Sequence, residues 1–164
     1  MVDVNSILKA VEAALQKKFP GEPVYWDELP KDFRRPSFTV ECPKEEEADA
    51  AIGLVRRTVE VLVTCYAEVD AYYDSSRQEL NRRMDGVLSI FGRGFLPVGD
   101  RSLAVQANKG EGAPDFAEVT ARFSFLDGRS GYIDEDTAPE SESGVPRMED
   151  YTLHVDVNTT KMKE

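Results

Sequence analysis

The sequence predicts a two-layer α+β domain in which two amphipathic helices cover one face of an antiparallel, possibly mixed, sheet of about four to five strands. Two segments repeat apolar residues every three or four positions, as a helix with one buried face does. Several other segments alternate apolar and polar residues, which is typical of strands with one face in water. The 164 residues, of which 41% are hydrophobic and 31% charged, fit a single domain spanning 1–164.

The two helices are expected over residues 4–18 and from about residue 75 to residue 91. Pro20 and Gly21 follow the first helix and end it, whereas Asp74 or Ser75 begins the second and Gly92 ends it. The residues that line their apolar faces are Val4, Leu8, Val11, Leu15 and Phe19 in the first, and Leu80, Met84, Val87, Leu88 and Phe91 in the second.

Strands are expected wherever the period changes to two. A short apolar piece covers 24–26, and an alternating strand covers 37–42 until Pro43 ends it. A charged connector at 44–49 leads to the longest alternation, 58–67, which we expect to pair with the preceding strand. Further strands are expected at 102–107, 116–126 and 151–157. The glycine pairs at 92–94 and 110–112 lack a phosphate-binding spacing and are interpreted as turns.

The charge of the chain excludes several classes of function. Thirty-one acidic against 20 basic residues give a net charge of −11, which opposes sequence-independent binding to nucleic-acid phosphates, and we expect no specific nucleic-acid binding. No apolar run is long enough to cross a bilayer, and the first residues lack the features of a secretory signal, so we expect an intracellular protein and no membrane partner. The acidic excess concentrates in an expected flexible loop at about 127–148, with candidate residues Asp134, Glu135, Asp136, Glu140 and Glu142.

No residue pattern indicates catalysis, so we predict no catalytic, cofactor-binding or metal-binding residues, no cofactor, and no enzyme activity. Cys42 and Cys65 fall on the apolar faces of expected strands and are interpreted as packing residues. His154 is the only histidine, and we place it on the polar side of the last strand. The acids at 134–136 could offer oxygen ligands without an EF-hand spacing, so a small acidic ligand-binding or divalent-cation-binding domain stays open as an alternative.

Aromatic and arginine side chains supply the candidate protein interface. These residue types dominate binding energy at protein–protein contacts. The candidates are Trp26, Phe33, Arg34 and Arg35 in a proline-bounded loop, with Tyr66, Tyr72 and Tyr73 near the end of the long strand. The competing interpretation is that Trp26 and Phe33 simply cover the core.

Read in order, short motifs of the chain resemble those of the phage tail terminator, or tail completion, proteins of Gram-positive prophages. The motifs lie at 17–20, 24–25, 35–40, 56–61, 87–88, 116–123 and 148–150, with sequences KKFP, VY, RPSFTV, RRTVEV, VL, FAEVTARF and MED. The chain departs from the family pattern at Lys31-Asp32 and in a longer, more acidic linker at 127–147. The contacts of those two loops are therefore the least transferable.

The resemblance implies a structural virion-assembly protein that is present in the cytoplasm of the bacterial host during assembly and then lies in the virion tail, at the head–tail junction. Such proteins assemble with themselves as a ring, commonly a hexamer, on the head-proximal end of the tail tube, where they stop tube growth. The partners implied are the tail tube protein and a head-completion or connector protein. A related alternative is an adaptor in a phage-tail-like bacteriocin or injection machine, which has no head.

Overall fold

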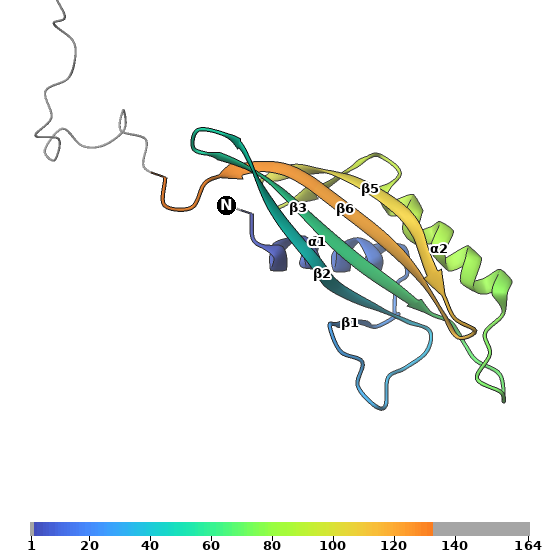
Figure 1. The fold of residues 1–164 in the computed structure, drawn as a ribbon. Coiled ribbons are helices and arrows are strands. Elements are labelled where there is room, and N and C mark those ends of the chain that lie inside the picture. Colours follow the sequence, from blue (N-terminus) through green and yellow to red (C-terminus); the bar gives the residue numbers. More distant parts are fainter. Residues whose placement is uncertain (1, 133–164) are drawn as a thin grey trace, which may run out of the picture. The chain divides into compact units, whose positions relative to one another are not determined.

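The computed structural model describes residues 2–132, which form two helices and one sheet of six strands (Figure 1). The expected strand at 151–157, His154 and the five candidate acids of the acidic loop lie outside these residues. The elements in chain order are α1 (Val4–Lys18), β1 (Val24–Trp26), β2 (Ser37–Ala51), β3 (Leu54–Tyr66), α2 (Arg77–Phe91), β4 (Phe95–Val98), β5 (Arg101–Gly112) and β6 (Phe116–Gly128).

The sheet is mixed and has the strand order β1-β2-β3-β6-β5-β4. Strand β1 runs parallel to β2, and every other neighbouring pair is antiparallel. The expectation of four to five strands is therefore corrected to six. The strand that sequence reasoning missed is β4, which has only four residues and contains Pro97, a residue that sheets confine to edges.

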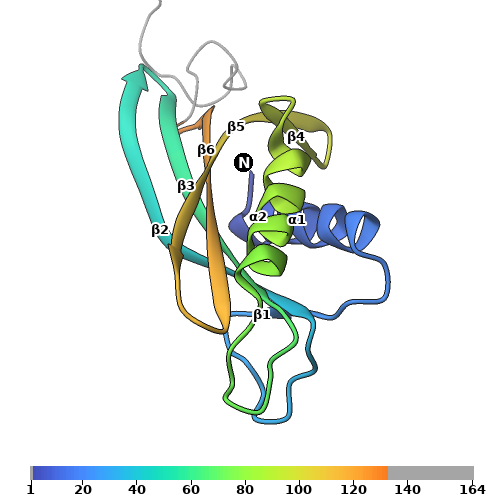
Figure 2. The ribbon, with the colours of Figure 1, turned by 90° about the vertical axis from the view of Figure 1, so that its right-hand side faces the viewer.

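Both helices pack on the same face of the sheet, as predicted (Figure 2). Helix α1 has the expected bounds and buries Ile7, Leu8, Val11 and Leu15. Helix α2 begins at Arg77, slightly later than expected, and its N-cap residue is Ser76. Asp74 and Ser75 instead belong to the preceding loop, where the N–H of Ser75 donates to the carbonyl of Pro114 at 2.9 Å.

The core lies between the helices and the apolar face of β3 and β6. In the register of these strands Val61 faces Ala121 and Val63 faces Val119, and all four side chains are fully buried. Cys65 continues this face, and burial raises the pKa of its thiol to about 12. Cys42 is half-buried and packs against the same core. The predicted packing role of both cysteines agrees with these positions.

Two arginines are buried beside the core and are held by carboxylates and aromatic rings. The guanidinium of Arg83 lies 4.8 Å from the ring centre of Phe38 and 5.5 Å from that of Phe19, and it forms an ion pair with Glu22. Arg57 forms an ion pair with Glu45 and lies 3.6 Å from Asp127. Burial is tolerated because each charge is paired and hydrogen-bonded.

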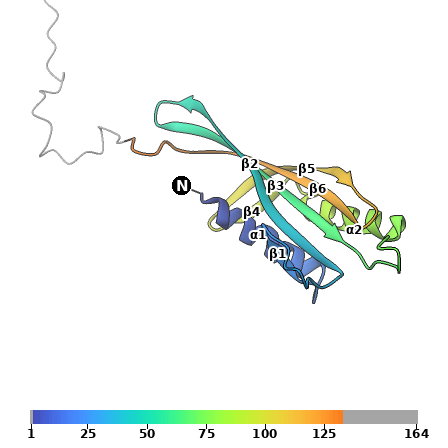
Figure 3. The same cartoon turned by 60° about the horizontal axis from the view of Figure 1, so that its bottom comes forward.

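Strand β2 does not end at Pro43. The register against β3 shifts between Glu41 and Lys44, so Pro43 sits in an irregularity of the ladder where its missing N–H breaks no regular pairing. The charged residues 44–49, expected as a connector, therefore pair with β3. Residues 43–56 form a hairpin that we call the arm, and it projects beyond the helices (Figures 1 and 3).

The two glycine pairs behave differently. Gly92 and Gly94 form the turn that was predicted, and Gly94 has the positive φ of +76° that favours glycine. The pair at 110–112 was predicted as a turn, and this was wrong because these residues form the end of β5. A register shift between Lys109 and Gly112 explains the error, since glycines also mark such irregularities in strands.

Candidate protein interface

Three loops meet at the end of the sheet where β2 begins and β3 ends. They span residues 27–36, 67–76 and 113–115, and we call them together the loop end. The loop end lies at the opposite end of β2 and β3 from the arm (Figure 1). Six of the seven sequence-predicted interface residues lie in these loops or at Tyr66, which leads into them. The seventh, Trp26, immediately precedes the first loop.

Arg35 connects the loops through several hydrogen bonds. Its Nη1 donates to the carbonyl oxygens of Ala67 at 3.1 Å and Asp115 at 2.9 Å, and its Nη2 donates to Oδ2 of Asp115 at 2.7 Å. An arginine fork can satisfy several acceptors at once in a fixed geometry. Arg35 therefore holds the loop end together, and its side chain is only 16% exposed.

The rings of Phe33 and Tyr66 form the surface on which Arg35 rests. Its guanidinium carbon lies 4.9 Å from the ring centre of Phe33 and 5.2 Å from that of Tyr66. The two rings are 5.2 Å apart in an edge-on arrangement, and Tyr66 also contacts Phe116 at 6.0 Å. Burial raises the pKa of Tyr66. Through these contacts, Phe33 and Tyr66 stabilise the loop end from within the chain.

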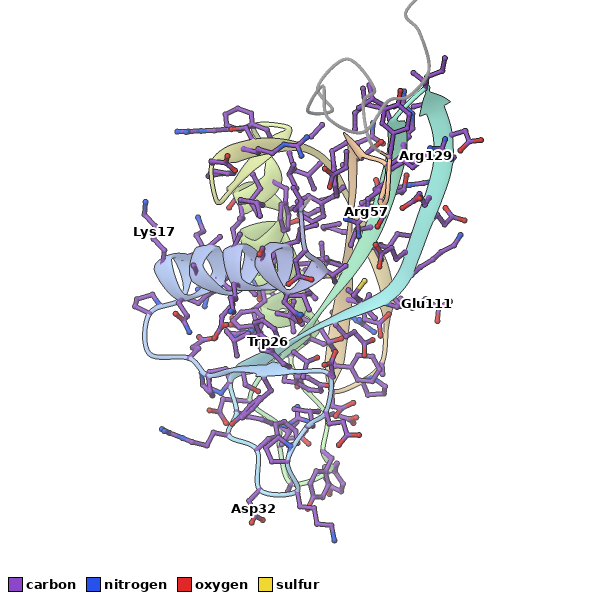
Figure 4. The ribbon with its side chains drawn as sticks, turned by 90° about the vertical axis from the view of Figure 1, so that its left-hand side faces the viewer. Lys17, Trp26, Asp32, Arg57, Glu111 and Arg129 are labelled. Carbon is purple, nitrogen blue, oxygen red and sulfur yellow. The ribbon has the colours of Figure 1, made fainter. Side chains whose placement is uncertain are left out.

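Trp26 lies on β1 beneath α1 (Figure 4). Its Nε1–H donates to Oε2 of Glu12 at 2.9 Å, and the partly buried ring packs against the core. Its polar and apolar parts both have partners inside the chain, which favours the interpretation that it covers the core. Arg34 is exposed, and its backbone N–H donates to the hydroxyl of Tyr25 at 3.2 Å.

Tyr72 and Tyr73 are the exposed part of the loop end, with 85% and 76% of their surface accessible. The loop that carries them is tied by Asp70, whose Oδ1 accepts the N–H groups of Tyr72 at 2.8 Å and Asp74 at 3.0 Å. Tyr73 has a φ of +63°, a conformation that costs a non-glycine residue about 1 kcal/mol or more. The loop thus presents two large rings from a braced, strained backbone.

Sequence reasoning missed the two aspartates that organise this end. Asp70 lies four residues before Asp74 in a polar loop, and an aspartate that accepts nearby N–H groups is a recognisable turn signal. Asp115 carries no such local signal, because its partner Arg35 is 80 residues away in the chain. Asp32 of the Lys31-Asp32 step is exposed at the tip of the first loop (Figure 4).

Residues 6–126 match a family whose description is phage tail terminator protein. The chain belongs to the phage tail terminator family. The matched region begins in α1 and ends in β6, so it includes the loop end and the arm. Comparison with curated protein sequences finds no match.

Family membership confirms the resemblance found in the motifs and places them on the fold. The motif at 17–20 ends α1, the motif at 35–40 enters β2, and those at 56–61 and 116–123 lie in the paired strands β3 and β6. The motif at 148–150 lies outside the described residues. As a phage tail terminator, the chain is a structural component of the virion tail that associates with other tail or virion proteins.

Two further findings concern the part of the chain that the structure describes. Within residues 2–132, no group of three or more His, Cys, Asp or Glu side chains is arranged to hold a metal ion. Neither of the helices in this part is long and apolar enough to cross a lipid bilayer.

Proposed function

We propose that this chain caps the head-proximal end of the tail tube, stops tube polymerisation and helps to join the tail to the head. The observation that carries the proposal is the family match over residues 6–126. Assembly then takes place in the cytoplasm of the bacterial host. The proposed role is structural. The loop end is built from packing contacts and hydrogen bonds, and it exposes tyrosine side chains, a residue type enriched at protein–protein contacts.

The capping form is a closed ring of identical copies, most simply a hexamer. Copies in a ring contact each other through two unlike surfaces, because each copy meets its two neighbours with different faces. The fold offers unlike surfaces in its helical layer, its open sheet face and its arm. Light scattering coupled to size exclusion, in the presence of short tubes, tests the ring.

The tail tube subunit is the partner proposed for the loop end. Tyr72 and Tyr73 are rigid aromatic side chains on a loop already tied by Asp70, so little conformational entropy is lost when they are buried. Arg34 is exposed in the neighbouring loop and adds a positive charge. The opposite side of the ring would receive the head-completion protein.

The test is the length of tails in particles that lack this protein, measured by electron microscopy. We expect overlong tails of variable length that are not joined to heads. A plasmid copy of the wild-type chain should restore uniform, head-joined tails. Normal tails attached to heads in the absence of the protein would overturn the proposal.

A further inference from the structure

One edge of the sheet is open along the arm. Strand β1 covers β2 only at Phe38–Val40, so within residues 2–132 the stretch 44–49 of β2 pairs with β3 on one side and with no strand on the other. Every residue from Pro43 to Ala51 is exposed. Unpaired N–H and C=O groups of such an edge are a template on which another extended chain can add.

A backbone hydrogen bond at the end of the arm shows which backbone groups point outward at this edge. The N–H of Arg129 donates to the carbonyl of Gly53, which lies opposite it on the β3 side of the ladder. The backbone N–H and C=O groups of odd-numbered residues of β3 therefore point toward β6, and those of even-numbered residues point toward β2. In the register of the arm, Glu46 and Ala48 oppose the even residues Thr58 and Arg56. The backbone groups of Glu45, Glu47 and Asp49 therefore point away from the sheet.

The other edge of the sheet is closed to strand addition. The N–H of Val105 donates to the carbonyl of Gly94, which shows that the backbone groups of even-numbered residues of β4 point toward β5. In that alternation Phe95 and Pro97 are the residues whose backbone nitrogens point outward. Pro97 has no N–H to donate, so this short edge cannot support a continuous ladder. The two edges differ: proline blocks one, and the arm has no such block.

Charge decides which strand can add to the arm. Residues 44–49 contain the carboxylates of Glu45, Glu46, Glu47 and Asp49 and the one base Lys44. Glu45 pairs with Arg57, and Asp49 pairs with Arg129 at 2.7 Å. Glu46 pairs with Lys44 at 2.8 Å, whereas Glu47 has no ion-pair partner among the described residues. Two such arms pairing with each other would place like charges side by side, which is unfavourable. A second copy is therefore a poor occupant, and a basic strand is a good one.

We propose that the outward edge of β2 at Glu45–Asp49 is a strand-addition site for an extended, lysine-rich or arginine-rich segment of another protein of the tail assembly. Backbone hydrogen bonds to Glu45, Glu47 and Asp49 hold the segment, and its basic side chains meet the acidic arm. Ile52 at the tip is 88% exposed and offers an apolar contact beyond the ladder. The identity of the partner as a tail protein rests on the proposed function. The hydrogen-bonding and charge properties of the edge do not depend on that proposal.

The direct test uses the full chain and a synthetic peptide that alternates lysine and threonine over about six residues, the length of an ordinary strand. Binding is followed by amide chemical shifts and hydrogen exchange in the isotope-labelled protein. We expect shifts and slowed exchange at Glu45, Glu47 and Asp49, and weaker binding as salt is raised. A peptide with glutamate in place of lysine should not bind.

Two variants separate strand addition from simple charge attraction. Glu47→Pro removes an outward N–H without touching the ladder to β3 and should weaken peptide binding by about tenfold or more. Glu47→Lys keeps the N–H and should weaken the lysine peptide while improving binding of the glutamate peptide. Glu46→Pro serves as the orientation control: it removes an inward N–H and should lower the melting temperature more than Glu47→Pro does.

The proposal is overturned if the peptide leaves the edge amides unchanged, if Glu47→Pro binds as tightly as the wild type, or if the shifts fall only elsewhere on the molecule. These outcomes are independent of tail length. Loss of the capping function in particles would leave peptide binding unaffected, so the two proposals fail separately.

Discussion

At the scale of single residues, Arg35 is the side chain on which the loop end most depends. It reaches backbone or side-chain oxygens of two other loops and rests on two aromatic rings. We predict that Arg35→Ala lowers the free energy of unfolding by about 2 kcal/mol, because charged hydrogen bonds at a partly buried site are lost. Chemical denaturation measures this.

The neighbouring arginine provides the control. Arg34 is exposed, and its one hydrogen bond in the loop uses the backbone N–H, so Arg34→Ala should change stability by less than about 0.5 kcal/mol. Arg35→Lys should be intermediate, since a lysine keeps the charge but cannot reproduce the fork. Equal losses of unfolding free energy in Arg34→Ala and Arg35→Ala would contradict the role of Arg35 in holding the loop end together.

Asp127 gives a prediction about pH. Burial acts to raise the pKa of Asp127, but hydrogen bonds from the N–H groups of Val2 and Gly128, together with Arg101, hold it below the ordinary value of 3.8. A carboxyl whose pKa is lower in the folded state stabilises the fold above its unfolded pKa and loses this contribution as the pH falls through the folded pKa.

We therefore predict that Asp127→Asn is less stable than the wild type at neutral pH by roughly 1–3 kcal/mol, because Arg57 and Arg101 lose a charged partner. The difference should shrink as the pH falls below about 4. Thermal melts of both proteins across this range provide the measurement. A difference that stays constant down to the lowest pH would rule out the charge of Asp127 as its cause.

The exposed tyrosines give a prediction that separates binding from folding. Tyr73→Gly relieves a positive φ and Tyr72→Ser removes an exposed ring, so the double variant should melt within a few degrees of the wild type. In particles it should give overlong tails if the loop end meets the tube. Uniform tails with this variant would remove the loop end from the proposed interface.

At the scale of elements, the contact between α1 and α2 depends on a glycine. A Cβ on Gly86 would lie 2.6 Å from Cζ of Phe19, the residue that ends α1 and packs against Phe38 at 4.8 Å. Alanine favours a helix interior over glycine by about 1 kcal/mol, but here the close contact opposes that gain.

We predict that Gly86→Ala destabilises the protein by about 1–2 kcal/mol, because the ring of Phe19 must move within a packed site. Phe19→Leu shortens the side chain and makes room for the new Cβ. The double variant should therefore lose less unfolding free energy than the sum of the losses in the two single variants. A double-mutant cycle of unfolding free energies measures this coupling. Additive effects would show that the two residues do not constrain each other.

Local patterns predicted most elements because burial imposes them directly. The apolar faces of α1 and α2 and the alternation of β3 and β6 follow from one face meeting the core. The arm was missed because its side chains are charged on both faces, and nothing apolar marks residues 44–49 as a strand. Its pairing comes from continuation of the β3 ladder past Pro43, which is a long-range effect.

At the scale of the whole molecule, the residues predicted as a protein interface lie in or beside the loop end, but the sequence does not show how they meet. The aromatic and arginine types at 26–35 and 66–73 were visible from composition. Some of these residues, such as Arg35 and Tyr66, stabilise the loop end from inside, and others, such as Tyr72, are exposed. Which residue does which depends on Asp115 and on the convergence of three loops. No spacing in the chain encodes that convergence.

The fold places different chemistry at the two ends of its longest strands. The loop end presents tyrosines on a braced loop, and the arm presents an acidic open edge. A protein that joins two unlike structures needs two unlike surfaces, and we infer that the loop end faces the tube. This arrangement is the physical basis of the proposed function.

The proposed capping role is best tested by measuring tube growth in the presence of the purified protein. Tail tube subunits are polymerised on short tube seeds, and tube length is followed with time by electron microscopy. We predict that the wild-type chain stops elongation and that the Tyr72→Ser, Tyr73→Gly double variant does not. Elongation that continues unchanged with the wild-type chain bound or present in excess would contradict the capping role.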